Sequence, residues 1–177
     1  MNSNSAARNS KAGRSDLAFV ALGSNLGNSR ELIRKAMARL QEFSDQPLLQ
    51  SSLWQTSPVD CPPGSPSFVN AVVGLLPRSD ETPETLWQKL QALEKEFGRK
   101  PKQVMNEPRP LDLDLIAFGS EIRDSPALTL PHPRAYQRRF VLQPLSEFAS
   151  ESTLVGQSKT IGQLLSELKD QENAQKL

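Results

Sequence analysis

The sequence predicts an α+β sandwich, on the basis of three observations. Short apolar runs that suit buried strands alternate with longer segments whose apolar residues recur at helical spacing, in the order β-α-β-β-α-β. The two central strands follow one another without a helix between them, as in a hairpin, which favours an antiparallel sheet. The 177 residues suit one domain with a single continuous core.

The first strand and the first helix follow one another directly. Residues 17–22 (LAFVAL) form a short apolar run closed by the residues GSN, which indicates a buried strand that leads into a turn. Asn28 is a suitable cap for a helix that begins at Ser29. One face of this helix would be apolar and would carry Leu32, Ile33, Ala36, Met37, Leu40 and Phe43.

The central strands enclose a proline-rich loop. Residues 50–56 (QSSLWQT) alternate loosely and residues 67–76 (SFVNAVVGLL) form a long β-branched run, so both are predicted to be strands. Residues 59–66 lie between them and are too rich in proline for regular structure, which predicts a stiff, exposed loop.

The second half of the chain adds three helices and one strand. A hydroxyl cap, a proline and an acidic first turn begin the second helix at residues 82–84, and Gly98 ends it. Its apolar face would carry Leu86, Leu90, Leu93 and Phe97. The remaining predicted elements are a strand at residues 113–118, a short helix at 138–148 and a last helix at 160–168.

This order of elements is that of a ferredoxin-like sandwich, an antiparallel central sheet flanked by helices, which we expect on one side of the sheet. Residues 16–170 would form the single domain. Residues 1–15 predict a disordered tail, with a short organelle-targeting segment as the alternative, because they are rich in Ser, Asn, Ala and Arg and contain no acidic residue. Residues 171–177 are expected to form a frayed C-terminus.

Composition excludes several classes of protein. The 21 basic and 20 acidic side chains nearly balance, so nucleic-acid binding through net charge is not indicated. The single Cys61 cannot form an internal disulfide, and no apolar run approaches the roughly 20 residues that cross a bilayer. These features favour a cytoplasmic protein with no membrane or nucleic-acid partner.

Two aspartates stand out in the strand predicted near residue 113. Asp112 and Asp114 lie two residues apart, so both point to one face of the strand, while Leu111, Leu113 and Leu115 would point into the core. Neighbouring carboxylates repel one another, and a divalent cation with oxygen ligands, most naturally magnesium, relieves that repulsion. The alternative is an acidic, solvated strand face, and the spacing alone does not separate the two.

Basic residues just before the aspartates strengthen the metal interpretation. Arg109 lies three residues before Asp112, and Arg99, Lys100 and Lys102 lie upstream. Magnesium and arginine together suit phosphoryl and pyrophosphoryl transfer, because the metal bridges phosphate oxygens while arginines neutralise charge in the transition state. The alternative for this loop is a solubilising run of surface charge.

An amide and an aromatic residue share one face of the second central strand. Asn70 lies in an apolar run and needs hydrogen-bond partners, either local groups or a ligand. Phe68 lies on the same face, and such a pair can stack on a flat heterocycle and read its edge. Core packing is the alternative for Phe68 and Phe140. The GSNLGN turn at residues 23–28 lacks the lysine of a P-loop, and a lone His132 in a rigid loop is more often a surface residue.

Four segments, taken in order, resemble the 6-hydroxymethyl-7,8-dihydropterin pyrophosphokinases of folate biosynthesis. They are ALGSNLGN near the start, the turn TSP with SFVNAVVGL, EKEFGRK with PRPLDLD, and LTLPHPRAYQRRFVLQPL. The resemblance covers about residues 18–148. Four segments in the family's order and spacing are highly specific.

The resemblance implies transfer of the β,γ-pyrophosphoryl group of ATP to the hydroxymethyl oxygen of the pterin, giving the pterin pyrophosphate and AMP. It also implies two magnesium ions between Asp112, Asp114 and the triphosphate, with Arg99 and Arg109 as catalytic arginines that hold the moving group. The pterin would be bound by Gly23, Asn25, Thr56, Val59, Phe68, Asn70 and Phe140. ATP would be bound by Gln91, Glu94, Arg99, Arg109, Leu115, Thr129, His132 and Arg138.

Some positions depart from the family pattern. Met105 and Asn106 replace an arginine-tryptophan pair on the loop before the aspartates, and Pro101 stands where another arginine is often found. The missing charge could come from Lys100, Lys102 or Arg134.

Two other functions compete with this interpretation. A ferredoxin-like module that binds single-stranded RNA would need exposed aromatic residues and a basic face, whereas aromatic residues make up 6% of this chain. A sugar transferase with a paired-aspartate motif would need a larger parallel α/β domain. Neither fits as well as a pyrophosphokinase. Enzymes that transfer phosphoryl groups often close mobile loops over their substrates, and we expect two such lids at residues 58–66 and 99–108.

Overall fold

The computed structural model describes residues 16–169 and 173–177. The tail predicted for residues 1–15 lies outside the described residues. Within the described part of the chain, no helix is both long enough and apolar enough to cross a membrane.

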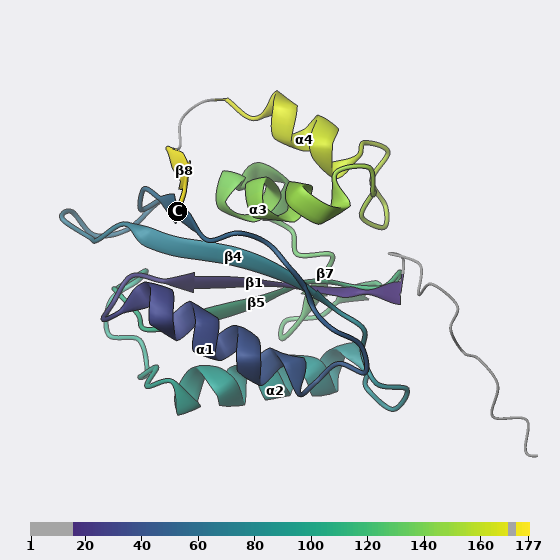
Figure 1. The fold of residues 1–177 in the computed structure, drawn as a ribbon, viewed down its shortest axis with the longest axis horizontal. Coiled ribbons are helices and arrows are strands. Elements are labelled where there is room, and N and C mark those ends of the chain that lie inside the picture. Colours follow the sequence, from purple (N-terminus) through teal and green to yellow (C-terminus); the bar gives the residue numbers. More distant parts are fainter. Residues whose placement is uncertain (1–15, 170–172) are drawn as a thin grey trace, which may run out of the picture.

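An antiparallel sheet organises the molecule (Figure 1). Its strands are ordered β5-β1-β4-β3-β8, and β2 also pairs with β4. The predicted α+β sandwich on an antiparallel sheet is therefore confirmed. The long strands are β1 (Ala18–Ser24), β4 (Phe68–Leu75) and β5 (Asp112–Phe118), and the short ones are β2 (Leu49–Gln50), β3 (Trp54–Thr56) and β8 (Ala174–Lys176).

Helices cover both faces of this sheet (Figure 1). On one face lie α1 (Ser29–Gln41) and α2 (Pro83–Glu96), and on the other lie α3 (Arg139–Ala149) and α4 (Ile161–Glu167). The expectation that the helices lie on one side is therefore wrong, although each predicted helix is present.

The reason lies in the side chains of the strands. Val20 and Val73 belong to the core under α1 and α2, while their neighbours Phe19 and Val72 belong to the core under α3 and α4. A strand that is buried on both faces is apolar along its length, because neither set of alternate side chains meets water. The unbroken run LAFVAL has this property, so the second covered face was readable in the sequence.

Polar caps fix where the helices begin. The Asn28 side chain accepts a hydrogen bond of 3.4 Å from the backbone N–H of Glu31 at the start of α1. At α2, which begins at Pro83, the capping residue Thr82 and Thr85 of the first turn each bind the backbone N–H of the other. These caps satisfy backbone donors that have no partner within the helix.

The strand predicted at residues 50–56 is divided into β2 and β3. The break occurs at Ser51, whose hydroxyl accepts the backbone N–H of Val72 at 2.9 Å. A side chain thus replaces a backbone carbonyl in the ladder. The structure also contains a separate ribbon that was not predicted, formed by β6 (Arg123–Asp124) and β7 (Thr129–Leu130).

The last residues form a strand where fraying was expected. β8 pairs with β3, and the backbone N–H of Leu177 donates to Leu53 O at 2.9 Å. The Lys176 ammonium lies 6.0 Å from the centre of the Trp54 ring, and the Trp54 indole N–H donates to Glu147 of α3 at 2.6 Å. Contacts to residues far away in the sequence therefore stabilise a segment that has no apolar pattern of its own.

Candidate active site

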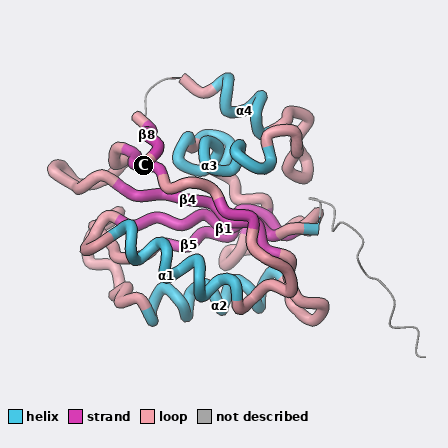
Figure 2. The backbone as a smooth tube through the Cα atoms, viewed as in Figure 1, coloured by secondary structure: helices cyan, strands magenta, loops and turns pink. Residues whose placement is uncertain are grey.

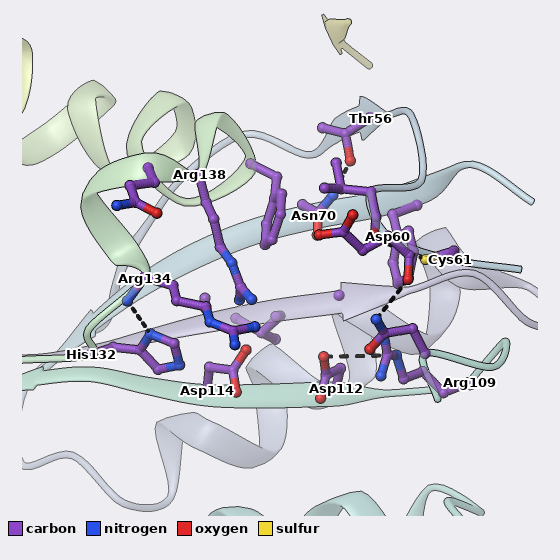
Figure 3. A pocket seen from close by; sticks show the side chains of 18 of the residues that line it. Thr56, Asp60, Cys61, Asn70, Arg109, Asp112, Asp114, His132, Arg134 and Arg138 are labelled. Carbon is purple, nitrogen blue, oxygen red and sulfur yellow. Dashed lines mark hydrogen bonds and ion pairs between the residues drawn. The ribbon is translucent and has the colours of Figure 1, made fainter. Parts of the chain in front are cut away.

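The sheet face under α3 opens into a cleft of about 660 Å³ (Figure 3). Its floor comes from β1, β4 and β5, and one wall comes from residues 132–140. Residues 57–67 and 97–111 form two loops that leave the sheet at the same end and supply the rest of the wall (Figure 2).

A glycine on β1 leaves room for this cleft. Gly23 pairs with Asn70 of β4 on one side and with Asp112 of β5 on the other. A Cβ atom at Gly23 would lie 3.1 Å from Asn70 Oδ1 and 3.6 Å from the Phe68 ring. Any side chain here would crowd the amide and fill the space between amide and carboxylate.

The two aspartates enter the cleft from β5 (Figure 3). Asp112 and Asp114 line it, whereas Leu113 and Leu115 lie in the core under α1 and α2, as the alternation predicts. Burial, followed by the negative charge of Asp112, raises the pKa of the Asp114 carboxyl to about 6. Positively charged arginines nearby act in the opposite direction. Two partly buried carboxylates side by side favour a divalent cation.

The donor set fits magnesium that is shared with a phosphate ligand. Among the described residues, no group of three or more His, Cys, Asp or Glu side chains could hold a metal ion. Asp112 and Asp114 would therefore supply only part of a coordination shell. Mg²⁺ is commonly held by one or two carboxylates together with phosphate oxygens and water.

Two arginines lie beside these carboxylates. Arg99 Nη1 lies 2.5 Å from Asp112 Oδ1 and also forms an ion pair with Glu94 of α2. Arg109 Nε lies 3.8 Å from Asp112 Oδ2 and is buried without a hydrogen-bond partner among the described residues. A buried donor without an acceptor is unfavourable, so Arg109 is prepared for an anionic ligand.

Aromatic and amide groups form the opposite part of the cleft. Phe68 lies at the start of β4 and Phe140 at the start of α3, and both line the cavity. Asn70 is 5% exposed and donates a hydrogen bond from Nδ2 to the Thr56 hydroxyl. The Arg138 guanidinium lies 5.3 Å from the centre of the Phe140 ring. This combination suits a flat ligand with a polar edge.

Hydrogen bonds to β5 and to Arg134 hold His132 in one orientation. Its backbone N–H donates to Ile116 O at 2.8 Å, and its ring Nδ1 accepts the backbone N–H of Arg134 at 3.2 Å. Burial and the positive charges of Arg138 and Arg134 lower the pKa of the His132 imidazole. A neutral ring whose Nδ1 accepts carries its proton on Nε2, which makes Nε2–H the available donor.

Comparison with known proteins decides the family. Residues 19–150 match the family described as 7,8-dihydro-6-hydroxymethylpterin-pyrophosphokinase, or HPPK. The chain belongs to the HPPK family. The predicted family and the predicted class of enzyme, a pyrophosphokinase of folate synthesis, are thereby confirmed.

Bacterial relatives align over most of their length with this HPPK chain. It is 35% identical over 153 residues to the 2-amino-4-hydroxy-6-hydroxymethyldihydropteridine pyrophosphokinase of Haemophilus influenzae, covering 86% of this chain and 93% of that one. The enzyme of the same name from Pseudomonas aeruginosa is 38% identical over 137 residues, covering 77% of this chain and 82% of its own. By contrast, the chain spans 17% of the folic acid synthesis protein fol1 of Pneumocystis carinii, to which it is 36% identical.

Solved structures share the HPPK fold. A crystal structure of HPPK-DHPS in complex with substrates superposes with a TM-score of 0.65 at 11% identity, covering 85% of this chain and 44% of that one. An HPPK-DHPS of Plasmodium falciparum gives a TM-score of 0.65 at 13% identity, with 85% and 43% covered. The chain thus spans less than half of these HPPK-DHPS chains.

Most of the predicted site residues meet in the cleft of this HPPK. The catalytic and metal-binding candidates Arg99, Arg109, Asp112 and Asp114 line it together. The other predicted residues that line it are Gly23, Thr56, Val59, Phe68, Asn70, His132, Arg138 and Phe140. Their roles as ligands of ATP, pterin or metal stay predictions.

Five predicted residues do not line the cleft. Leu115 and Thr129 line a neighbouring cavity of about 260 Å³, which shares Asp114, His132 and Pro133 with the cleft. Glu94 is buried behind Arg99, and Gln91 is exposed on α2. Asn25 is buried next to the cleft, where it bonds to backbone groups of both loops.

Other residues line the cleft without having been predicted as ligands. Lys102 and Arg134, two candidates for the missing charge, are among them. Lys100 instead lines an adjoining pocket of about 360 Å³, which shares Arg99, Lys102 and Arg109 with the cleft. Asp60, Cys61 and Gln137 also line the cleft. Asp60 and Cys61 lie in an irregular loop and Gln137 ends a single 3-10 turn, Ala135–Gln137. None of these segments is long enough or regular enough to show a side-chain period, so only their position near the recognised segments could have indicated them.

Proposed function

We propose that this chain transfers the pyrophosphoryl group of ATP to 6-hydroxymethyl-7,8-dihydropterin and releases AMP, as a step in folate synthesis. The observation that carries the proposal is one cleft with two chemically different halves. Asp112, Asp114 and the unpaired Arg109 donor suit a magnesium-bound triphosphate, and Phe68 with Asn70 suits a flat heterocycle. The two halves meet over Gly23.

In this reaction the hydroxymethyl oxygen of the pterin forms a bond to the β-phosphorus of ATP. The bond between that phosphorus and the oxygen bridging to the α-phosphate breaks, AMP leaves with the bridging oxygen, and the hydroxyl proton passes to solvent. The chain has to bring these groups into line and to stabilise the negative charge on the phosphate oxygens.

Asp112 and Asp114 would hold Mg²⁺, two ions in our proposal. The metal would neutralise phosphate charge and help to activate the attacking hydroxyl. The protein's share is to keep both carboxylates on one strand face, half-buried, so that a cation relieves their repulsion.

Several donors would hold the triphosphate. Arg99 and Arg109 would bind the oxygens of the moving group and neutralise their negative charge in the transition state. Lys102, Arg134 and Arg138 line the same cleft and add positive charge. The Nε2–H group of His132 would donate one more hydrogen bond to a phosphate oxygen.

The pterin would lie between Phe68 and Phe140. Asn70, oriented by Thr56, would read its polar edge with Oδ1 and the remaining N–H, and the backbone near Val59 would complete the contacts. The absence of a side chain at Gly23 would let the hydroxymethyl group approach the phosphates.

The test is AMP formation by the purified protein, with pterin and magnesium added together or singly. We expect AMP only when both are present. No AMP above background with both would overturn the proposal. The predicted cytoplasmic location is a separate expectation, which localisation of the tagged protein would test.

A further inference from the structure

The two loops that line the cleft are tied together at their crests. Asn106 Nδ2 donates a hydrogen bond of 2.7 Å to the backbone oxygen of Asp60. Asp60 lies in the loop 57–67 between β3 and β4, and Asn106 lies in the loop 97–111 between α2 and β5. Both residues line the cleft, so this crest contact joins its two walls at the open side.

The partners of the crest contact share an uncommon backbone conformation. Asp60 has a φ of 51° and Asn106 a φ of 55°, and no other non-glycine residue in the described part of the chain has a positive φ. Aspartate and asparagine tolerate this region better than most residues, but it remains unfavourable and persists only where the surroundings enforce it. That the two positions meet in one hydrogen bond indicates that each loop holds the other in place.

The same loops are also joined at their bases. Asn25 Oδ1 accepts the backbone N–H of Arg109 at 2.9 Å, and Asn25 Nδ2 donates to Pro66 O at 3.3 Å. The backbone N–H of Asn25 donates to Arg109 O at 3.1 Å. Asn25 is 4% exposed and so forms a fixed point. Because the two loops are joined through Asn25 near the sheet and through the crest contact at the open side, they form one connected unit.

We propose that Asn106 is a positioning residue that makes the two loops move over the cleft as one unit. It acts through the Asp60 carbonyl and needs no contact with ATP or pterin. The mechanical coupling belongs to the free protein. Its effect on turnover rests on the proposed function: Lys102 of the loop 97–111 reaches the phosphates when the loop 57–67 closes over the pterin.

Three variants separate the hydrogen bond from other effects. Asn106→Gly removes the donor and keeps a residue that accepts positive φ. Asn106→Asp keeps the shape of the side chain and its tolerance of positive φ, but its carboxylate cannot donate to a carbonyl. Asp60→Asn is the control, because it keeps the accepting backbone carbonyl and the backbone preference while it removes the side-chain charge.

Backbone ¹⁵N relaxation of the full chain without substrates measures the coupling. In the wild type we expect Asp60 and Cys61 to have order parameters near those of rigid backbone, about 0.85. In Asn106→Gly and in Asn106→Asp we expect values for these two residues to fall towards about 0.6, although both substitutions lie in the other loop. Asp60→Asn should stay close to the wild type.

Turnover gives a second readout. Loss of one hydrogen bond predicts that kcat/KM for both substrates falls about fivefold in both Asn106 variants. Unchanged relaxation at residues 57–67 in the Asn106 variants would overturn the coupling, whatever the enzyme's activity. Loosening by Asn106→Gly but not by Asn106→Asp would also overturn it, because the flexibility of glycine would then be the cause. Absence of AMP formation in the wild type would overturn the proposed function and leave the relaxation test intact.

Discussion

The two faces of the central sheet use the same strands in different ways. On the face under α1 and α2, β1 and β5 present buried apolar side chains along their length, among them Leu22 and Leu113. On the face under α3, the strands are apolar at one end, where Phe19 lies in the core, and polar at the other, where Asp112 and Asp114 line the cleft. Stability and chemistry are therefore separated by side-chain direction, and neighbouring residues of one strand can be tested against each other.

The largest effect is expected from the cleft face. Asp114→Asn removes a proposed magnesium ligand, so turnover should fall by about a thousandfold or more. It also removes a buried charge that is disfavoured in the absence of a cation, so stability should not fall. AMP formation and thermal unfolding measure the two quantities. The matched control is Asp80→Asn at an exposed position. Turnover within tenfold of the wild type would remove Asp114 from the catalytic machinery.

The neighbouring residue on the opposite face should give the reverse result. Leu113→Ala leaves a cavity in the core under α1 and α2, and we expect the free energy of unfolding to fall by about 2–4 kcal/mol. Turnover per folded molecule should stay within about threefold of the wild type. Urea unfolding and AMP formation at a temperature where the variant is folded test this. A tenfold loss of turnover there would show that the faces are not independent.

Within the α3 face, the comparison can be narrowed to two phenylalanines. Phe68→Ala should weaken pterin binding about tenfold or more, because loss of base-like stacking costs about 1–3 kcal/mol, and should leave the affinity for an ATP analogue within about threefold. Phe148→Leu, a control at a partly buried ring that packs beside Phe19, should change stability without changing pterin affinity. Calorimetric titration with each ligand measures both. Equal loss of both affinities in Phe68→Ala would contradict the stacking role.

The smallest effect is a pH dependence of stability. The pKa of Asp114 in the folded protein, about 6, lies above the ordinary aspartate value, so the folded state binds this proton more tightly than the unfolded state. Its contribution to stability is present below about pH 4 and is lost as the pH rises to about 6. Magnesium should offset this loss, and therefore stabilise the protein more at pH 7 than at pH 5. Urea unfolding of metal-free wild type against Asp114→Asn checks the sign, and identical pH profiles would contradict it.

The sequence was most informative where side chains follow a period. The alternation at Asp112 and Asp114 predicted which face they share, and the same argument brought Phe68 and Asn70 together. It failed for loop residues such as Asp60, because an irregular backbone has no period from which to infer direction. It also failed for β8, whose pairing depends on Trp54 and other residues far away in the sequence.

The alternation of side chains over residues 111–115 also constrains how this segment can evolve. Substitutions at Asp112 or Leu113 affect one face at a time, so selection can act on catalysis and on stability separately. Insertion or deletion of one residue within 112–115 would instead exchange the faces, turning leucines into the cleft and aspartates into the core. We therefore expect homologues of this protein to differ by substitutions within residues 112–115, and none to differ by an insertion or deletion there.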